Sequence, residues 1–582
     1  MAAPSISRAD RKAATGRWGP VLLDDEGSSL LRNSLKIVPF AAPIDRRMMP
    51  DTPSTTDPIA PPRGAEDSSG HQRPAELHPT GELSTARKPG ERSRRPFVLR
   101  IGVALAAGVV VLLAILASSG LLAGDPIGAA DNGDGGRLFC GAGLVPATPD
   151  GRSNWKGAVV MSFDRVAPCS EPIPSSAGVI LRAAVHGTSN PWSLTRLGWL
   201  YAALAAAVFT VATWAATRKG LVKALVLVPP LLPLANRDFS RFFLSTFSEP
   251  AGLLGAFTLV CGIGVVWVAD RTHRPERMIG LVLVAGGGLL ATTAKSAYVP
   301  LLAVAALVCA MTPVSVRSGE RHWYDRLGPS VLALMTVFLA VGPLTTALDW
   351  QTRHYPAVNA HNLIYTTVLT GVPNATTMLG LPPAAAEHAG QAYYPAGPEG
   401  VPGSDLIAST PDAMRNSAWR VLAEHPSALL DAAGIAMQAT EGRTLTYLPS
   451  VAWTPGTTTV DSGLAGEQGA TGPTLHAWLD GMSTPWLPSL LAAFGIAAGV
   501  AGTVRRGSSW SSFARLAGTA GVSSVLLAVM AVLGDGYFEI AKHVWLAAYL
   551  LDVTTFALVG VVVAVIVQRY SRRARVLRRD AE

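Results

Sequence analysis

Residues 98–123 read VLRIGVALAAGVVVLLAILASSGLLA, and Arg100 is the only charged residue among them. A helix that crosses the roughly 30 Å hydrocarbon layer of a membrane needs about 20 mostly apolar residues. This stretch is therefore predicted to be a transmembrane helix. Nine further apolar blocks follow, at 193–216, 221–236, 250–269, 278–294, 298–313, 327–348, 486–504, 514–533 and 544–567.

The composition supports this interpretation. The chain has 582 residues, of which 49% are hydrophobic and only 15% charged, and its mean hydropathy is +0.31. This is too apolar for a water-soluble enzyme of that size. We expect an all-α polytopic membrane protein with about ten transmembrane helices, three of them short.

The positions of Lys and Arg predict the orientation, because short cytoplasmic connections are enriched in both. Six basic residues precede or enter the first block, against the single acid Glu91: Arg87, Lys88, Arg92, Arg94, Arg95 and Arg100. Every second connection thereafter is also basic, as are residues 569–582. Both termini are therefore predicted to be cytoplasmic. The net charge of +8 then follows from topology, and it gives no reason to expect a nucleic-acid partner.

These patterns divide the chain into five parts. Residues 1–95 are rich in Pro, Ser, Arg and Asp without an apolar period, which is typical of a disordered tail. The full division is a disordered cytoplasmic tail at 1–95, transmembrane helices one to seven at 96–348 with a first outer loop at 124–192, a large and mostly helical extracytoplasmic loop at 349–485, helices eight to ten at 486–568, and a basic cytoplasmic tail at 569–582.

Two carboxylates, Asp131 and Asp134, lie in the glycine-rich sequence ADNGDG at 130–135, directly after the first span. A carboxylate within hydrogen-bond reach of a hydroxyl is suited to take its proton as the hydroxyl attacks, so both residues are candidate bases, with Asp131 preferred. Two acids at this spacing are also candidate oxygen ligands for a divalent cation such as Mg or Mn. In the plainest interpretation, Asp and Gly simply satisfy a turn.

Polar residues also occur at other predicted outer ends of spans. Arg237 and Asp238 lie among aromatic residues, and Glu249 directly precedes Pro250, a pattern that also fits an ordinary helix start. Lys295 is a lone ammonium between two apolar blocks. Its side chain either reaches the lipid headgroups or binds a phosphate.

The densest cluster is GDGYFEIAKH at 534–543, between the last two blocks. If it is helical, Asp535, Glu539 and His543 lie at successive i, i+4 positions on one face, with Lys542 beside them. Such a stripe could be only a helix cap and an intrahelical pair. Charges between two apolar spans are expensive to bury, however, which favours a functional role.

The four cysteines fall into two groups. Cys261 and Cys309 lie inside spans and are expected to be packing residues. Cys140 and Cys169 share the first outer loop, where an oxidising exterior would allow them to pair. The sequence leaves open whether they do.

Five segments resemble the GT-C-type membrane glycosyltransferases, and among them the bacterial hexose transferases of surface-layer glycan biosynthesis. They are ADNGD at 130–134, FFLSTFSEP at 242–250, AK at 294–295, HNLIY at 361–365 and GDGYFEIAKH at 534–543. The resemblance covers about residues 100 to 570. It implies a GT-C-like fold in a bacterial cytoplasmic membrane, a polyprenyl-phosphate sugar as donor, and a glycan or lipid acceptor on the outer face among membrane lipids.

The resemblance also implies that an acidic residue of the first outer loop acts as the base or orients the acceptor. Asp131 or Asp134 would have this role. The donor phosphate or sugar would be bound by the remaining polar residues, namely Arg237, Asp238, Glu249, Lys295, His361, Asp535, Glu539, Lys542 and His543. Two other classes stay open: a transporter or flippase of lipid-linked saccharides, for which Pro229, Pro230 and Pro233 are the best sign of a broken helix, and a noncatalytic membrane scaffold.

Overall fold

The computed structural model describes residues 94–579 except 132, 154–156, 270–273, 316–321, 395–396, 442–444, 446–447, 449–450, 454–455, 457–483 and 506. Residues 94 and 95 begin the first helix, and the rest of the predicted tail at 1–95 lies outside the described residues. The description below concerns the compact unit that begins at Arg92.

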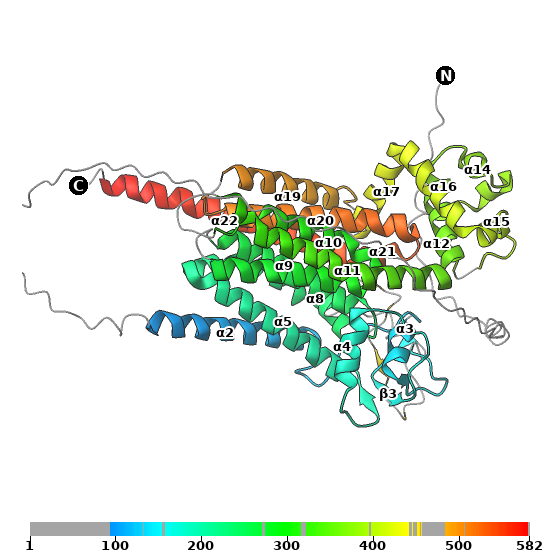
Figure 1. The fold of residues 1–582 in the computed structure, drawn as a ribbon, viewed down its shortest axis with the longest axis horizontal. Helices are drawn as coiled ribbons and strands as arrows, with labels where there is room; N and C mark the ends of the chain where they lie inside the picture. Colours follow the sequence, from blue (N-terminus) through cyan, green and yellow to red (C-terminus); the bar gives the residue numbers. More distant parts are fainter. Residues whose placement is uncertain are drawn as a thin grey trace, which may run out of the picture. The chain divides into compact units, whose positions relative to one another are not determined.

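Helices dominate this unit, and the longest of them run side by side (Figure 1). They are α2 (Arg94–Ser118), α5 (Thr195–Ala216), α8 (Glu249–Val268), α9 (Arg274–Ala294), α11 (Leu327–His354), α19 (Leu487–Val504), α20 (Ser511–Asp535) and α22 (Trp545–Arg579). Shorter helices between them are α3 (Gly136–Phe139), η3 (Cys140–Ala142), α4 (Ser176–Val185), η5 (Thr217–Lys219), η6 (Leu221–Leu227), α6 (Val228–Leu234), α7 (Arg237–Ser240), η7 (Arg241–Leu244), η8 (Ser296–Tyr298), α10 (Val299–Met311), η9 (Trp323–Arg326) and α21 (Ile540–His543).

Eight helices of the described residues are long and apolar enough to cross a membrane. Each coincides with one of the ten predicted blocks. The other two blocks form shorter apolar helices, Leu221–Leu234 and Ser296–Met311. In the first of these, Pro229 and Pro230 open α6 and Pro233 lies inside it, and proline removes a helical N–H and clashes with the preceding turn. The prediction of a polytopic helical membrane protein is therefore confirmed.

Helix α8 is the most deeply enclosed of the eight, and it packs along α9. Glycines make this contact close. A Cβ at Gly287 of α9 would lie 2.4 Å from the backbone nitrogen of Leu259, and one at Gly255 of α8 would lie 2.6 Å from that of Ala291. Small residues allow helix backbones to approach in this way when lipid supplies no hydrophobic driving force. The contact fixes the ends of α8 and α9 relative to each other.

The region between α2 and α5 contains short strands as well as helices. Strands β1 (Leu144–Pro146), β3 (Ser162–Arg165) and β4 (Trp192–Ser193) form an antiparallel sheet in the order β1-β3-β4, with Val145 opposite Asp164. Strand β2 (Val159–Val160) pairs in parallel with β5 (Ala452–Trp453). The second pairing attaches this region to a segment almost 300 residues later in the chain.

The region after α11 is also mostly helical, as predicted. It comprises α12 (Pro356–Asn362), η10 (Leu363–Val368), α13 (Leu369–Gly371), α14 (Ala375–Met378), η11 (Pro383–His388), α15 (Ser404–Ser409), α16 (Pro411–Glu424) and α17 (Pro426–Ala439). These helices have a core of their own, in which Leu363, Ile364, Tyr365 and Ala418 are fully buried. Figure 1 shows them at the same end of the long helices as α3 and β3. We call residues 356–439 the cap.

Candidate functional site

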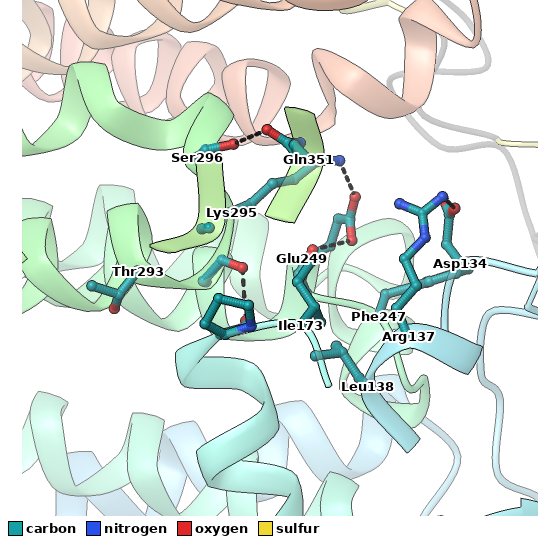
Figure 2. A pocket seen from close by; sticks show the side chains of 15 residues that line it. Asp134, Arg137, Leu138, Ile173, Phe247, Glu249, Thr293, Lys295, Ser296 and Gln351 are labelled. Atoms are coloured by element: carbon teal, nitrogen blue, oxygen red, sulfur yellow. Dashed lines mark hydrogen bonds and ion pairs between the residues drawn. The ribbon is translucent and has the colours of Figure 1, made fainter. Parts of the chain in front are cut away.

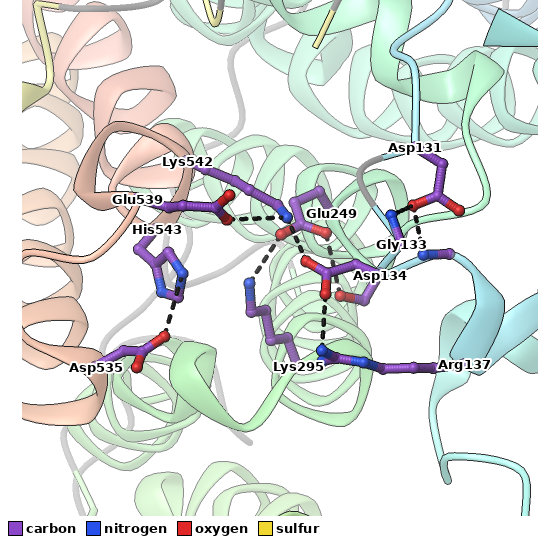
Figure 3. Close-up of polar contacts among 12 residues, drawn as sticks. Asp131, Gly133, Asp134, Arg137, Glu249, Lys295, Asp535, Glu539, Lys542 and His543 are labelled. Atoms are coloured by element: carbon purple, nitrogen blue, oxygen red, sulfur yellow. Dashed lines mark hydrogen bonds and ion pairs between the residues drawn. The ribbon is translucent and has the colours of Figure 1, made fainter. Parts of the chain in front are cut away.

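Four segments far apart in sequence meet at this end of the long helices (Figure 3). They are the loop before α3, the first turn of α8, the residue after α9, and the connection between α20 and α22. Two ion pairs join them: Lys542 with Asp134, and Lys295 with Glu249 at 2.8 Å. The structure thus brings together side chains that the sequence placed only on one side of the membrane.

The two acids of the glycine loop have different surroundings. Asp131 is buried, and its Oδ1 accepts hydrogen bonds from the backbone N–H groups of Gly133 and Gly135, both at 2.8 Å. Its Oδ2 accepts the hydroxyl of Ser153 at 2.5 Å. The preference for Asp131 as the base does not fit this geometry, because these donors hold its carboxylate within the loop, apart from the ion pairs of the site (Figure 3). Asp131 instead holds the loop in shape.

Glycine is required within this loop. Gly133 has a φ of 106°, a conformation that other residues rarely adopt. A Cβ at Gly135 would lie 2.3 Å from Oδ2 of Asp131 and 2.2 Å from the hydroxyl oxygen of Thr246. The ADNGDG pattern therefore encodes a tight turn, and the turn interpretation of it is correct.

Asp134 faces the site. Its carboxylate contacts Lys542 through one oxygen and Arg137 at 2.8 Å through the other. Burial raises the pKa of Asp134, but the charges of Lys542 and Arg137 outweigh burial and hold the pKa well below its ordinary value. Asp134 is therefore a carboxylate in this arrangement, neutralised by two cations.

Lys542 is the central cation of the site. Its side chain is only 1% exposed, contacts Asp134, and lies 3.5 Å from Glu539. Its Nζ also lies 4.8 Å from the ring centre of Phe247, within the range of a cation–π contact. Burial lowers the pKa of Lys542, and the surrounding carboxylates reverse that effect and raise the pKa above its ordinary value. A buried ammonium held by exchangeable anionic partners is a candidate phosphate ligand.

The second ion pair joins two helix ends. Glu249 is the first residue of α8 and is 2% exposed, while Lys295 directly follows α9. Each charge suits its position, since a helix N-terminus favours an anion and a C-terminus a cation. Ser248 donates its hydroxyl to Glu249 at 3.2 Å. The helix-start interpretation of Glu249 is thus correct, and the same residue also belongs to the site.

The segment at 534–543 is not one continuous helix. Helix α20 ends at Asp535, Gly536 has a φ of 58°, and Glu539 has a φ of 44°, so the chain turns twice before α21 begins. A Cβ at Gly536 would lie 2.3 Å from the hydroxyl oxygen of Thr366 in the cap. The condition for the i, i+4 stripe is therefore not met, because packing against the cap requires a tight turn at this point.

Two residues of the predicted stripe nevertheless meet. Nε2 of His543 lies 3.6 Å from a carboxylate oxygen of Asp535, and Asn362 of α12 donates to the other oxygen at 2.9 Å. Burial, with Lys295 and Lys542 nearby, lowers the pKa of His543 to about 3. His543 is therefore a neutral imidazole that can accept or donate a hydrogen bond beside the two lysines.

Three predicted residues lie elsewhere. Arg237 and Asp238 begin α7, where the side chain of Asn236 accepts from the N–H of Asp238 at 3.2 Å. Helix α7 packs on α6 and η7. His361 is buried in the cap, with its ring stacked 4.4 Å from that of Tyr365. These positions fit roles in helix capping and in cap packing.

A small pocket of about 60 Å³, partly open to solvent, lies among these groups (Figure 2). Asp134, Arg137, Glu249 and Lys295 line it on the polar side. Its remaining walls include Leu138, Ile173, Pro174, Phe247, Ala294, Ser296, Ala347 and Gln351. Asp131 is not among the lining residues, and Lys542 is connected to the pocket through its ion pair with Asp134, which lines it.

Sequence reasoning missed Arg137 and Phe247. Arg137 pairs with Asp134, and its guanidinium lies 4.4 Å from the ring centre of Tyr355, at the end of α11. Phe247 contacts Lys542. Arg137 was visible as the first cation after the two acids, but no pattern in the sequence indicates an aromatic partner for a lysine 295 positions away.

Two further expectations concern covalent and metal chemistry. Cys140 and Cys169 form a disulfide, with their Cα atoms 5.3 Å apart. It ties η3, which directly follows the helix that carries Arg137, to the loop before α4. No group of three or more His, Cys, Asp or Glu side chains among the described residues is placed to hold a metal ion. The candidate divalent cation therefore has no assigned site.

Comparison with known families supports the transmembrane character of the chain. A family model described as the YfdI N-terminal transmembrane domain matches residues 93–429, more than half of the chain. The matched region contains the glycine loop, Glu249, Lys295 and most of the cap, and it ends before α20 and Lys542. Comparison with curated proteins and with solved structures finds no match.

Proposed function

Since the chain belongs to the YfdI N-terminal transmembrane domain family, it is a multi-pass membrane protein, and we propose that it is a glycosyltransferase of the GT-C type. In this proposal it moves a hexose from a polyprenyl-phosphate donor to a glycan or lipid acceptor of the cell envelope. The observation that carries the proposal is a pair of lysines, Lys542 and Lys295, which are held by Asp134 and Glu249, two carboxylates that line one pocket.

The charges of the pocket suit a phosphate-linked donor. Ammonium groups bind phosphate through charge-assisted hydrogen bonds, and Arg137 adds a guanidinium to the same wall. Leu138, Ile173 and Ala347 supply apolar surface beside these cations. A lipid-linked sugar phosphate combines the two chemistries, and its lipid keeps it at the membrane.

Asp134 is the residue that we assign as the base. The acceptor hydroxyl oxygen attacks the anomeric carbon, the bond from that carbon to the phosphate oxygen breaks, and the hydroxyl proton passes to Asp134. The leaving polyprenyl phosphate takes the electron pair of the broken bond, and Lys542 and Lys295 stabilise its charge. The donor phosphate also competes with Asp134 for Lys542. Binding of the phosphate draws Lys542 away from Asp134 and places an anion nearby. Both changes raise the pKa of Asp134, which makes this carboxylate a better base.

We also propose ten membrane crossings. The ion pairs between helix ends support this number. At one end of α9, Glu276 lies 3.7 Å from Arg218, just after α5; at the other end, Lys295 pairs with Glu249 at the start of α8. The segment 221–234 must then lead from one side to the other. The same argument applies to α10. Ser296 in η8, just before α10, donates a hydrogen bond at 2.9 Å to Gln351 near the end of α11, so α10 begins on the side where α11 ends and must cross to the side where α11 begins.

The orientation of these crossings is part of the proposal. The end that carries Arg218 is rich in Arg, which is typical of the cytoplasmic side. The pocket would then open on the outer face of a bacterial cytoplasmic membrane, with both termini in the cytoplasm. A polyprenyl-linked sugar is a suitable donor there because its lipid carrier can present it on that face.

A transfer assay tests the function. Purified protein in lipid nanodiscs is given a labelled polyprenyl-phosphate hexose and a cell-envelope glycan fraction. Replacing Asp134 by Asn should lower the transfer rate by about 10²- to 10⁴-fold, the usual contribution of a general base. Asp150→Asn is the matched control, because Asp150 lies in the same outer region, pairs with Arg152 and is absent from the pocket lining.

Two results would count against the proposal. Normal transfer by Asp134→Asn would refute the base assignment. Inactive wild-type protein that instead moves a labelled lipid-linked saccharide between leaflets would replace the transferase with a flippase, for which the prolines of α6 are the structural argument.

A further inference from the structure

A row of aromatic rings lies between the cap and the connection from α20 to α22. His361 lies against Tyr393, with ring centres 5.5 Å apart, and Tyr393 lies against Tyr394 at 4.9 Å. Tyr394 in turn lies 6.4 Å from Phe538, with the two rings inclined at 50°. The row begins in the buried core of the cap and reaches the surface at Tyr394, which is 48% exposed.

Hydrogen bonds connect this row to the charged site. The side-chain oxygen of Asn362 accepts the N–H of Tyr393 at 2.8 Å, and the side-chain nitrogen of Asn362 donates to Asp535 at 2.9 Å. Phe538 directly precedes Glu539, which lies 3.5 Å from Lys542. The neighbours of Tyr394 and Phe538 in the chain, Tyr393 and Glu539, thus connect these two rings to the charged site, and we call Tyr394 and Phe538 the aromatic shelf.

The aromatic shelf differs in its surroundings from an ordinary belt of aromatic residues at a membrane interface. Such a belt faces lipid, where a charged side chain is costly. Here the side chains of Asp535 and Glu539 are 20% and 23% exposed, so neither carboxylate is fully buried.

We propose that the aromatic shelf is the subsite for the saccharide acceptor, which rests on the function proposed above. One face of a pyranose ring consists mainly of C–H groups, which pack on aromatic rings, while its hydroxyls donate hydrogen bonds to carboxylates. Tyr394 and Phe538 supply the rings, and Asp535 and Glu539 supply the acceptors. The same two acceptors adjoin the charged site, since Asp535 lies 3.6 Å from His543 and Glu539 lies 3.5 Å from Lys542.

This arrangement gives the two substrates separate approaches. The donor phosphate binds at Lys295 and Lys542, and the acceptor enters along the cap. Phe538 and Lys542 are four residues apart in sequence, so the connection between α20 and α22 carries contacts to both substrates. The cap therefore selects the acceptor.

Saturation-transfer NMR tests the subsite without requiring transfer. The probes are the methyl glycosides of glucose, mannose and galactose and their disaccharides, each added to the full chain in lipid nanodiscs. Saturation should reach the ring C–H protons of at least one probe. Tyr394→Ala and Phe538→Ala should each weaken binding about two- to tenfold, the size of one aromatic contact. Tyr394→Phe keeps the ring and should bind as wild type does.

The matched control is Tyr570→Ala, since Tyr570 is also an exposed tyrosine but lies near the other end of α22. It should leave binding unchanged. The proposal is overturned if no probe receives saturation, or if Tyr394→Ala and Phe538→Ala both bind as wild type does.

A kinetic measurement separates this proposal from the proposed function. Hydrolysis of the donor needs no acceptor, so Tyr394→Ala should raise KM for the acceptor while the hydrolysis rate stays unchanged. Wild-type protein that neither transfers nor hydrolyses would refute the glycosyltransferase assignment, and the NMR result would still decide whether the shelf binds saccharide. A variant that loses hydrolysis and transfer equally would show that Tyr394 acts on the donor, which overturns the subsite.

Discussion

Lys542 and Asp134 form an ion pair although 408 positions separate them in the chain. The pair joins the loop after α2 to the connection before α22, the first and last long helices. It has two consequences: Asp134 is kept ionised, and a buried ammonium is held at the edge of a pocket.

The ion pair should behave as a coupled unit. Lys542→Met leaves Asp134 with Arg137 alone and should lower the free energy of unfolding by about 3 kcal/mol, at the low end for a broken buried pair because Asp134 is one-third exposed. Adding Asp134→Asn should then cost less than it does alone. We expect a coupling energy of about 1 to 3 kcal/mol from thermal unfolding in detergent. The exposed pair Arg415 and Asp412 is the control, with coupling below about 0.5 kcal/mol.

Asp131 should matter for the loop rather than for proton transfer. Asp131→Ala removes the acceptor of the Gly133 and Gly135 amides and of the Ser153 hydroxyl. Buried donors without a partner cost about 1 to 3 kcal/mol, so the midpoint of thermal unfolding should fall. Asp131→Asn keeps an acceptor oxygen and should retain more stability and more transfer than Asp131→Ala. Equal stability of wild type and Asp131→Ala would contradict this role.

Acid should destabilise the cap through His361. Burial lowers its pKa to about 4 in the folded protein, against about 6.5 in an unfolded chain. Between these two values the unfolded chain binds a proton that the folded protein does not, so stability is lost as the pH falls. The slope from this group is about 1.4 kcal/mol per pH unit. His361→Phe keeps a ring against Tyr365 and should flatten the decline in unfolding midpoint between pH 6.5 and 4; an unchanged slope would exclude His361 as its source.

Cysteine labelling should report the two faces. Ser409 in the cap and Ser509 between α19 and α20 are both exposed. In intact cells, Ser409→Cys should react with a membrane-impermeant maleimide, whereas Ser509→Cys should react only after permeabilisation. The same pattern reversed would invert the proposed orientation, and labelling of both from outside would contradict the number of crossings.

The sequence predicted the long helices well because the signal is local. A block such as 98–123 must be buried in lipid or protein whatever else the chain does, and eight of the ten blocks became helices long enough to span. The other two, around α6 and α10, are shorter. In α6, three prolines interrupt a pattern that hydropathy alone counts as continuous.

The candidate site was only partly visible. Residue type identified Asp134, Glu249, Lys295 and Lys542, because charges beside apolar spans are costly. Asp535, Glu539 and His543 do not share one helix face, because that inference assumed a regular helical backbone through Gly536. The aromatic shelf had no local signal at all, because Tyr394 and Phe538 lie in different regions of the chain.

The sequence by itself therefore determined which segments are helices that enter the membrane and which charges lie at their ends, since both follow from the transfer of individual residues out of water. Only the tertiary structure decided which charges pair, which carboxylate faces the pocket, and which aromatic rings meet. Those relations depend on close packing between helices, such as the glycine contacts of α8 with α9, and packing is a property of two surfaces together. The division is clearest at 131–134, where two carboxylates three positions apart hold a loop and line a pocket, respectively.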